Sequence, residues 1–374
     1  MSELPEADRQ GDLPAPRETS ELIGQEKAEA AFLDAYMSGR LHHAWLLTGP
    51  KGVGKATLAY RMARFILKYG DAETAKAMGA TSLQMDEADP AFRQIAGLGH
   101  TDLLLLRRPA DEKTKKLKTV IPVEEVRRTA GFFGKSAGGG GWRVAIVDSA
   151  DEMNANAANA LLKVLEEPPS KSLFLLISHQ PGRLLPTIRS RCRKLALTPL
   201  APEAIDRILA HHAPDLSPEQ AALVAALSEG SAGRALSIAA AGGIELYTQM
   251  MTVLSSLPRL DIKALHAFAD MAARRGQDDK FDMALELLGD WAARLVRTLS
   301  QGPDSTTLPR EGELAARIGP RTGQSGGLDR WVEVWEKIGA MAARANALNT
   351  DRKLVILNAF SLIEAASRGL TVRA

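Results

Sequence analysis

The sequence predicts an α/β fold, in which a doubly wound parallel sheet is followed by helical regions. Three observations lead to this prediction. Continuous apolar runs alternate with helically spaced segments over the first 200 residues, as in strands that are buried on both faces of a parallel sheet. A glycine-rich loop joins the first run to a helix, and a later run ends in Asp148. Beyond residue 200 the spacing is helical throughout.

Composition limits the class of protein. A chain of 374 residues with 45% hydrophobic residues and a net charge of +2 is typical of a globular protein of two or three domains, and the charge gives no general signal for polyanion binding. The single Cys192 excludes a disulfide framework and a multi-cysteine zinc cluster, so we expect no zinc. Residues 1–20 predict a flexible leader without a signal peptide, and no stretch predicts a membrane span, which favours a cytoplasmic protein.

The first elements predict a phosphate-binding loop. A helix is expected up to Met37, a strand over residues 42–48 and a second helix over residues 57–67. Backbone N–H groups of a glycine-rich loop can surround phosphates, the helix N-terminus adds positive potential, and the lysine reaches the outer phosphates. The candidate nucleotide-binding residues are Gly49, Pro50, Lys51, Gly52, Val53, Gly54, Lys55, Ala56 and Thr57.

This loop departs from its motif at one position. The motif has Ser or Thr directly after the lysine as a magnesium ligand, whereas this chain has Ala56, with Thr57 one place later. One residue along a helix turns a side chain by about 100°, so Thr57 does not replace the missing hydroxyl. The loop therefore predicts a phosphate-binding fold that holds ATP or ADP, with a degenerate, empty loop as the alternative.

The next segment carries a cluster of lysines. A buried strand is expected over residues 101–106, and a helix begins near Pro122. Between them, Lys113–Lys118 is either a loop that faces DNA or a solvated charged loop, and the lack of an interleaved aromatic residue favours the second interpretation. Residues 138–141 predict a flexible connector.

The run Arg143–Val147 predicts a strand that delivers Asp148 to the carboxyl edge of the sheet, where nucleotides bind. Asp148 is the candidate ligand for magnesium, and no other metal is expected. In working ATPases of this type the next residue is a Glu that polarises the attacking water, but here it is Ser149. A serine cannot act as that base, which predicts a site deficient in hydrolysis.

Two more strands complete the predicted sheet. A helix over residues 154–167 ends at two prolines, and a strand over residues 173–177 leads into Ser178 and His179. These two polar residues either sense the terminal phosphate of a nucleotide or only cap the strand end. A last strand is expected over residues 194–197.

Together these residues resemble the clamp-loader ATPases of the AAA+ superfamily, and within it the subunits of bacterial DNA polymerase III. The resemblance covers residues 20–245 and depends most on the Leu-Glu-Glu-Pro-Pro and Ser-Arg-Cys motifs. The matching segments, in chain order, are Gly49–Thr57, Asp148–Asp151, Leu165–Pro169, Leu184–Cys192 and Gly230–Arg234.

The resemblance implies roles for two arginines. Arg191, in Ser-Arg-Cys, matches an arginine finger that reaches the ATP site of the neighbouring subunit; the alternatives are a pairing of Arg191 within its own chain, or Arg189 in this role. Arg234 matches the second-sensor arginine of a lid domain, with a helix-surface arginine as the alternative.

The resemblance also implies the domain order. We expect an AAA+ nucleotide-binding domain over residues 21–200, a helical lid over 201–243 and an all-helical collar over 244–374, broken at 300–327. The collar tryptophans, Trp291, Trp331 and Trp335, are expected more often in the core than at an interface. The family's usual zinc-binding cysteines are missing, which leaves the structure of residues 70–100 open.

The predicted function is that of a non-hydrolysing subunit, a stator, in a clamp loader that places a sliding clamp on primed DNA. Its implied partners are the gamma and tau motor subunits, the delta subunit, the clamp and DNA, with no membrane. The alternative is a self-sufficient AAA+ ATPase of DNA metabolism in which Asp151 replaces the missing base. A DNA-binding scaffold outside replication is disfavoured by the nearly neutral charge.

Overall fold

The computed structural model describes residues 5–9, 13–134, 141–274, 276–302, 305–319, 327–348 and 350–370. Its contacts group into two compact units: residues 1–208 with 229–234, and residues 209–228 with 235–374. The three domain boundaries predicted from the sequence stay predictions. No helix in the described ranges has the length and apolarity needed to cross a membrane.

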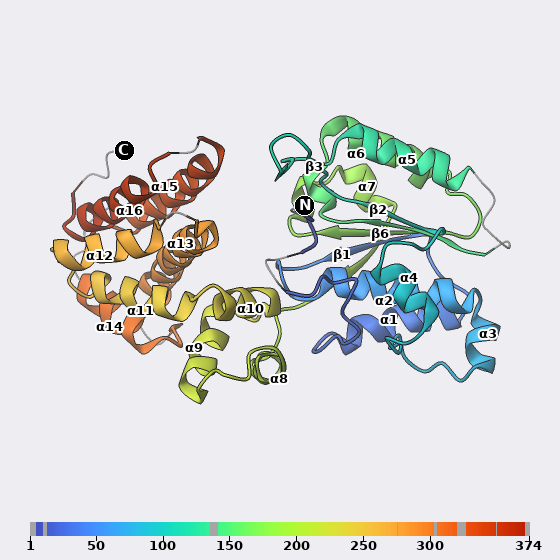
Figure 1. Ribbon diagram of the computed structural model, residues 1–374, viewed down its shortest axis with the longest axis horizontal. Coiled ribbons are helices and arrows are strands. Elements are labelled where there is room, and N and C mark those ends of the chain that lie inside the picture. Colours follow the sequence, from blue (N-terminus) through green and yellow to red (C-terminus); the bar gives the residue numbers. More distant parts are fainter. Residues whose placement is uncertain are drawn as a thin grey trace. The chain divides into compact units, whose positions relative to one another are not determined.

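Unit 1 contains the predicted parallel sheet (Figure 1). Five parallel strands lie in the order β2-β5-β6-β1-β7. Each matches a strand predicted from the sequence to within about two residues at either end. Their bounds are β1 (Ala44–Thr48), β2 (Leu103–Leu106), β5 (Arg143–Val147), β6 (Ser172–Ser178) and β7 (Arg193–Ala196). The α/β prediction is confirmed.

Alternate residues of each strand serve two separate cores. Along β6, Leu173, Leu175 and Ile177 join the core on one face, whereas Phe174 and Leu176 join the core on the other. Successive strand residues point to opposite faces, so a strand covered on both sides needs an unbroken apolar run. This explains why every residue of β6 is buried.

Helices cover both faces of the sheet (Figure 1). One face packs against α1 (Glu26–Met37), α2 (Lys55–Tyr69), α3 (Ala72–Ala77) and α4 (Pro90–Ala96). The other packs against α5 (Val123–Phe133), α6 (Ala155–Glu166) and α7 (Pro186–Ser190). The segment 70–100, left open by the sequence, therefore contributes α3 and α4 to the first layer.

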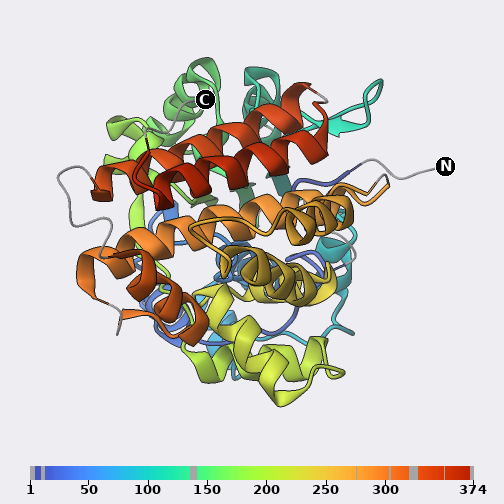
Figure 2. The same cartoon turned by 90° about the vertical axis from the view of Figure 1, so that its left-hand side faces the viewer.

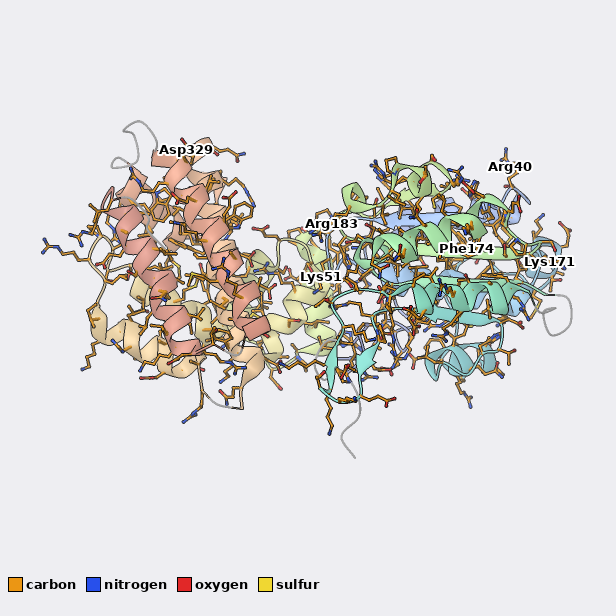
Figure 3. The ribbon with its side chains drawn as sticks, turned by 90° about the horizontal axis from the view of Figure 1, so that it is seen from above. Arg40, Lys51, Lys171, Phe174, Arg183 and Asp329 are labelled. Atoms are coloured by element: carbon orange, nitrogen blue, oxygen red, sulfur yellow. The ribbon has the colours of Figure 1, made fainter. Side chains whose placement is uncertain are left out.

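The two ends of the sheet carry different segments (Figure 3). Arg40 and Lys171 precede β1 and β6 and lie at the amino end, whereas Lys51 and Arg183 follow these strands and lie at the opposite end. Phe174 lies between, within the layers. The phosphate-loop candidates thus share the carboxyl end of the sheet with the residues that follow β6, as expected for a parallel α/β domain.

The N-terminal segment is attached to unit 1, which corrects the expectation of a flexible leader for residues 5–9 and 13–20. Ala15 is fully buried, and the Asp8 side chain is 1% exposed. Arg17 pairs with Asp8 at 2.7 Å and donates to Ala96 O at 3.1 Å. The charges that suggested a solvated leader are instead neutralised in ion pairs. We call residues 5–9 and 13–20 the strap.

The lysine-rich segment forms a small hairpin, which the sequence did not predict. Strands β3 (Ala110–Asp111) and β4 (Lys116–Leu117) pair antiparallel in a sheet of their own. The predicted connector over residues 138–141 lies outside the described residues except for Gly141.

Three helices match the predicted lid patterns: α8 (Pro202–His212), α9 (Pro218–Ser228) and α10 (Ala232–Ala240). Of these, α9 belongs to unit 2, whereas α8 and α10 each have residues in both units. The described elements of unit 2 after α10 are helices, as predicted, and α15 and α16 run side by side (Figure 2). The helices that follow α10 are α11 (Gly243–Leu254), α12 (Ile262–Ala272), α13 (Asp278–Gln301), α14 (Pro309–Ile318), α15 (Gly327–Leu348) and α16 (Arg352–Ser367).

The structure of unit 2 corrects the predicted break at residues 300–327 and separates the buried tryptophans from an exposed one. Helix α14 lies inside the segment 300–327 that was expected to be a break, because Pro309 starts this helix rather than interrupting one. Trp291 and Trp331 are buried and pack edge to face, with ring centroids 6.1 Å apart. Trp335 is 45% exposed, so it does not belong to the core.

Candidate functional site

The phosphate loop has the backbone geometry that its glycines permit. Gly52 and Gly54 have φ angles of 78° and 97°, in the left-handed region that favours glycine. A Cβ at Gly52 would collide with Ser231 Oγ, so this position also requires a residue without a side chain. The loop leads directly into the N-terminus of α2, where N–H groups can bind an anion.

Lys55 lies inside the loop that precedes it. Its side chain donates to Gly49 O at 2.7 Å and to Pro50 O at 2.5 Å, and the residue is 3% exposed. Burial lowers the pKa of Lys55 to about 8, although the charges of Asp151 and Asp148 oppose this shift. The ammonium group is thus close enough to both strand-end acids to feel their charge.

Asp148 follows β5 at the carboxyl edge, as predicted, and its N–H donates to Leu106 O at 2.8 Å. Burial raises the pKa of its carboxyl to about 7, and the charges of Asp8 and Glu152 act in the same direction. The structure therefore brings the loop lysine and the predicted magnesium ligand together, in surroundings that disfavour the charged carboxylate.

Neither Ser149 nor Asp151 offers an unengaged base, because the side chains of both contact the residues that follow β6. Ser149 has φ 59°, and its Oγ lies 3.4 Å from His179 Nε2. The carboxylate of Asp151 accepts from His179 N at 3.0 Å and from Gln180 N at 3.2 Å. Both Asp151 oxygens are engaged with the turn after β6, which argues against this residue as the base of a self-sufficient ATPase.

Ser178 and His179 end β6 beside the phosphate loop. Ser178 lies in register with Thr48, the last residue of β1, and both are buried. Within the described part of the chain, Ser178 Oγ and His179 Nδ1 have no hydrogen-bond partner. Burial, with the nearby charge of Lys55, lowers the pKa of His179 to about 4, so its ring is neutral at pH 7. Neutral polar groups thus occupy the predicted sensor positions.

The segment that carries Arg234 is bonded to the loop through the residues before it. Ser231 Oγ donates to Lys51 O at 2.8 Å, and Gly233 N donates to Gly52 O at 3.0 Å. Arg234 N in turn donates to Ser231 Oγ at 3.2 Å. Hydrogen bonds therefore hold the backbone next to the predicted second-sensor arginine against the phosphate loop.

Arg191 lies away from this loop, at the C-terminal end of α7. Its Nη2 pairs with Glu166 Oε1 at 2.8 Å, and its Nη1 donates to Thr187 O at 3.0 Å. The Arg191 side chain is 36% exposed and that of Glu166 is 43% exposed. The intrachain pairing that the sequence left open is present, but it is a solvent-exposed pair of the kind that contributes little to stability.

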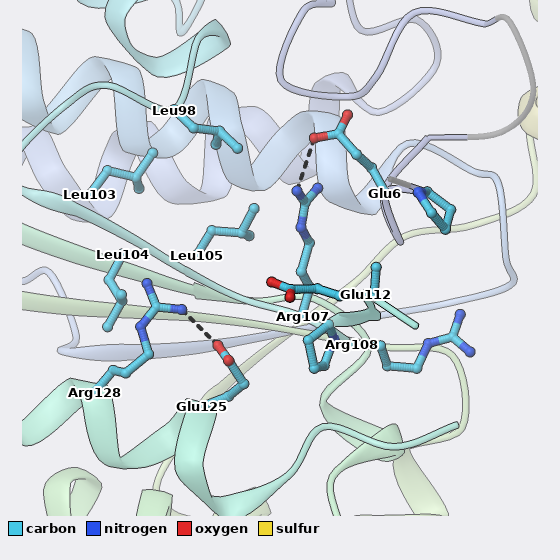
Figure 4. A pocket seen from close by; sticks show the side chains of 13 residues that line it. Glu6, Leu98, Leu103, Leu104, Leu105, Arg107, Arg108, Glu112, Glu125 and Arg128 are labelled. Atoms are coloured by element: carbon cyan, nitrogen blue, oxygen red, sulfur yellow. Dashed lines mark hydrogen bonds and ion pairs between the residues drawn. The ribbon is translucent and has the colours of Figure 1, made fainter. Parts of the chain in front are cut away.

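Sequence reasoning missed the strap as part of this site. Arg107, which follows β2, pairs with Asp8 and also with Glu6, at 3.0 Å from the latter (Figure 4). Tyr60 of α2 donates to Asp8 at 3.4 Å. The strap thus places a buried acid close enough to Asp148 to raise its pKa. Pairings between residues about a hundred positions apart leave no local pattern in a sequence.

The residues present could hold a magnesium ion, but with one protein ligand fewer than the motif provides. Magnesium in nucleotide sites is held by one or two protein oxygens together with phosphates. Asp148 is in place for this role, whereas Ala56 has no oxygen in its side chain. Among the described residues, no group of three or more His, Cys, Asp or Glu side chains could hold a metal ion.

Comparisons with known proteins agree with the sequence prediction. The sequence profile of the family described as "DNA polymerase III, delta subunit" matches residues 24–201. DNA polymerase III subunit delta' of Pseudomonas aeruginosa is 33% identical over 284 residues, which cover 76% of this chain and 80% of that protein. Subunit delta' of Bacillus subtilis is 37% identical over 195 residues, which cover 52% of this chain and 53% of that protein.

Two further matches carry other subunit names. DNA polymerase III subunit tau of Escherichia coli is 30% identical over 75% of this chain and 41% of its own length. A gamma subunit-related protein of Thermotoga maritima matches 92% of this chain and all of its own, with 16% identity and a TM-score of 0.44. The alignment with the Pseudomonas aeruginosa protein confirms that the chain belongs to the delta prime subunit family of DNA polymerase III.

Proposed function

We propose that this chain is a stator subunit of a clamp loader, which supplies Arg191 to the ATP site of a neighbouring subunit and turns over little or no ATP itself. Its partners would be gamma or tau motor subunits and the delta subunit, in a cytoplasmic assembly that loads a sliding clamp on primed DNA. Relatives of this chain are named as delta prime, gamma and tau subunits of DNA polymerase III.

The observation that carries this proposal is the position of Arg191. Its guanidinium is partly exposed and contacts Thr187 O and Glu166, and within the described residues it forms no hydrogen bond or ion pair with the phosphate loop. An arginine finger acts by placing a guanidinium against the transferred phosphoryl group, and it can contribute about 10³- to 10⁵-fold to the rate. Glu166 and solvent are weak competitors for such a contact.

The chain's own site supports the second half of the proposal. A nucleotide would be held by the loop N–H groups, Lys55 and the N-terminus of α2, and magnesium by Asp148 and the phosphates. Ser149 provides no base, and the nearest alternative acid, Asp151, is engaged by two backbone N–H groups. A missing base costs about 10²- to 10⁴-fold in rate. The loop, with Ser178, His179 and Arg234, would bind a nucleotide without efficient hydrolysis.

The test replaces Arg191 in a reconstituted complex. Arg191→Ala should lower clamp-stimulated ATP turnover at the adjoining site by about 10³-fold, because the cation on the transferred phosphoryl group is lost. Arg189→Ala is the matched comparison, since Arg189, the alternative candidate for this role, is exposed on α7 and is replaced with the same change of charge. It should leave turnover nearly unchanged, and a loss in this variant instead would assign the role to Arg189. Unchanged turnover in the Arg191 variant, with normal assembly of the complex, would refute the proposed role.

The self-sufficient ATPase remains a second candidate because the loop geometry, Lys55 and Asp148 are in place. The purified chain distinguishes the two. Multiple turnovers of ATP by the chain alone, abolished by Asp151→Asn, would favour the second candidate, whereas the stator proposal expects only background hydrolysis.

A further inference from the structure

The lysine-rich hairpin projects from the carboxyl end of the sheet in unit 1 (Figure 1). It follows β2 and contains Lys113, Lys115, Lys116 and Lys118, all exposed. Four lysines and two acidic residues between positions 110 and 118 make a basic cluster in a chain whose net charge is only +2. We define the basic hairpin as residues 109–118.

The basic hairpin has its own internal support. Asp111 Oδ1 accepts from Lys113 N at 3.0 Å, from Thr114 N at 2.8 Å and from Thr114 Oγ1 at 3.1 Å. Lys115 N donates to Asp111 O at 2.8 Å, and Lys118 N donates to Pro109 O at 2.9 Å. An aspartate that bonds the following backbone is a common way to fix a turn. The lysines therefore extend from a defined turn.

Three of these lysines keep their charge available. Within the described ranges, the side chains of Lys113, Lys116 and Lys118 form no hydrogen bond or ion pair. Hydrogen bonds with Thr114 and Lys113 lower the pKa of Asp111, and the charge of Lys118 is only a minor further cause. The arginines at the base of the hairpin differ: Arg107 pairs with Glu6 and Asp8, and Arg108 pairs with Glu152 at 2.7 Å. Figure 4 shows the Arg107–Glu6 pair among the residues that line a pocket. The volume of this pocket is about 460 Å³. The base of the hairpin is neutralised, whereas its turn and second strand are not.

We infer that the basic hairpin binds the phosphate backbone of nucleic acid. Lysines that contact phosphates release condensed counterions, which gives binding without sequence preference. The hairpin has no aromatic residue that could stack on a base, so the contact is with phosphates alone. An acidic protein surface is a poorer match, because protein interfaces have a core from which lysine is depleted and in which aromatic residues are enriched. This inference deepens the proposed function by naming a surface of the subunit that meets DNA.

The experiment measures binding of a labelled 20-base-pair duplex to the isolated full-length chain by fluorescence anisotropy, without ATP. Three phosphate contacts predict a slope of about −2.7 for log affinity against log salt, or about 40-fold weaker binding between 50 and 200 mM salt. Replacing Lys113, Lys116 and Lys118 together by Ala should remove most of this slope and weaken binding at least tenfold at 50 mM salt. Circular dichroism checks that the variant is folded.

The matched control replaces Lys27, Lys163 and Lys194 by Ala, since these lysines are exposed elsewhere on the chain. An equal loss of binding in both triple variants would overturn the inference in favour of a general charge effect. So would wild-type binding that lacks salt dependence, or no binding at 50 mM salt. Polyglutamate that binds the hairpin as tightly as duplex DNA would replace the nucleic acid by an acidic protein. None of these results depends on Arg191, so the proposed ATPase role stands or fails separately.

Discussion

Two parts of unit 1 hold their ionisable groups in opposite ways. At the phosphate loop, Lys55 is buried, and burial shifts the pKa values of Lys55, Asp148 and His179 toward the neutral forms. At the end of α7, Arg191 is partly exposed and pairs with an exposed carboxylate. A group that stays charged at the surface can act on another molecule. The difference is consistent with the proposal that Arg191 acts on a neighbouring subunit.

Beyond the Arg191 test, the largest effect should come from rebuilding the loop site itself. Ser149→Glu together with Ala56→Thr restores a base and a magnesium hydroxyl, and should raise the chain's own ATP turnover by about 10²-fold, the lower end for a positioned base. Ser149 already adopts the left-handed φ, and its Cβ meets the same steric cost as that of a Glu, so the replacement adds little backbone strain.

Steady-state hydrolysis by the purified double variant measures this gain, with Ala56→Thr alone as the control that lacks a base. If the double variant binds ATP but hydrolyses it no faster than the control, the loss of the Glu does not explain the inactive site.

A smaller effect concerns Asp148 and pH. The pKa of this carboxyl is about 7 in the folded chain, against an ordinary value of 3.8 for an exposed aspartate. The folded state therefore holds an extra proton between about pH 4 and 7, and the wild-type chain loses stability as the pH rises through this window. Asp148→Asn should raise the free energy of unfolding at pH 8 by about 1–2 kcal/mol and leave it nearly unchanged at pH 4.

Urea unfolding at both pH values measures the Asp148 effect, and Glu167→Gln, at an exposed position, is a control for lost negative charge. If Asp148→Asn stabilised the chain equally at both pH values, ionisation of the Asp148 carboxyl would not be what destabilises the folded state.

The smallest effect should come from the partner of Arg191. Glu166→Gln removes the ion pair but keeps the size of the side chain, and should lower turnover at the adjoining site of the reconstituted complex by about 2- to 3-fold, in line with an exposed pair worth up to about 1 kcal/mol. Glu167→Gln makes the same change next to it, where the structure shows no such pair with Arg191. Identical rates for both variants would mean that Glu166 does not position Arg191.

The sequence predicted what depends on local pattern. All five strands of the sheet, the loop before α2 and the edge position of Asp148 follow from apolar runs and motif spacing. The site's electrostatics could not be predicted in this way. Asp8 acts on Asp148 across a long stretch of chain, and Glu166 reaches Arg191 from a different helix. Such contacts are decided by tertiary packing.

One error had a local cause. Gly, Pro, Ser and Thr around α14 suggested a break, yet Leu314, Ala315 and Ile318 give this helix an apolar face. Glu311 is buried there and forms two hydrogen bonds with Arg294, at 2.8 and 2.9 Å. A buried charged residue interrupts the apolar pattern of a helix. A helix that has a buried ion pair with a neighbouring helix is therefore easily mistaken for a loop.

The attachment of the strap has a practical consequence for anyone who prepares this protein. A chain shortened to begin at α1 would lack Glu6 and Asp8, the two acids that pair with Arg107. The charge of Arg107 would then act on Asp148 without these counter-charges. Nucleotide titrations on such a trimmed sample would then report an artificially attractive pocket. The opening residues belong in every preparation used to decide what this subunit binds.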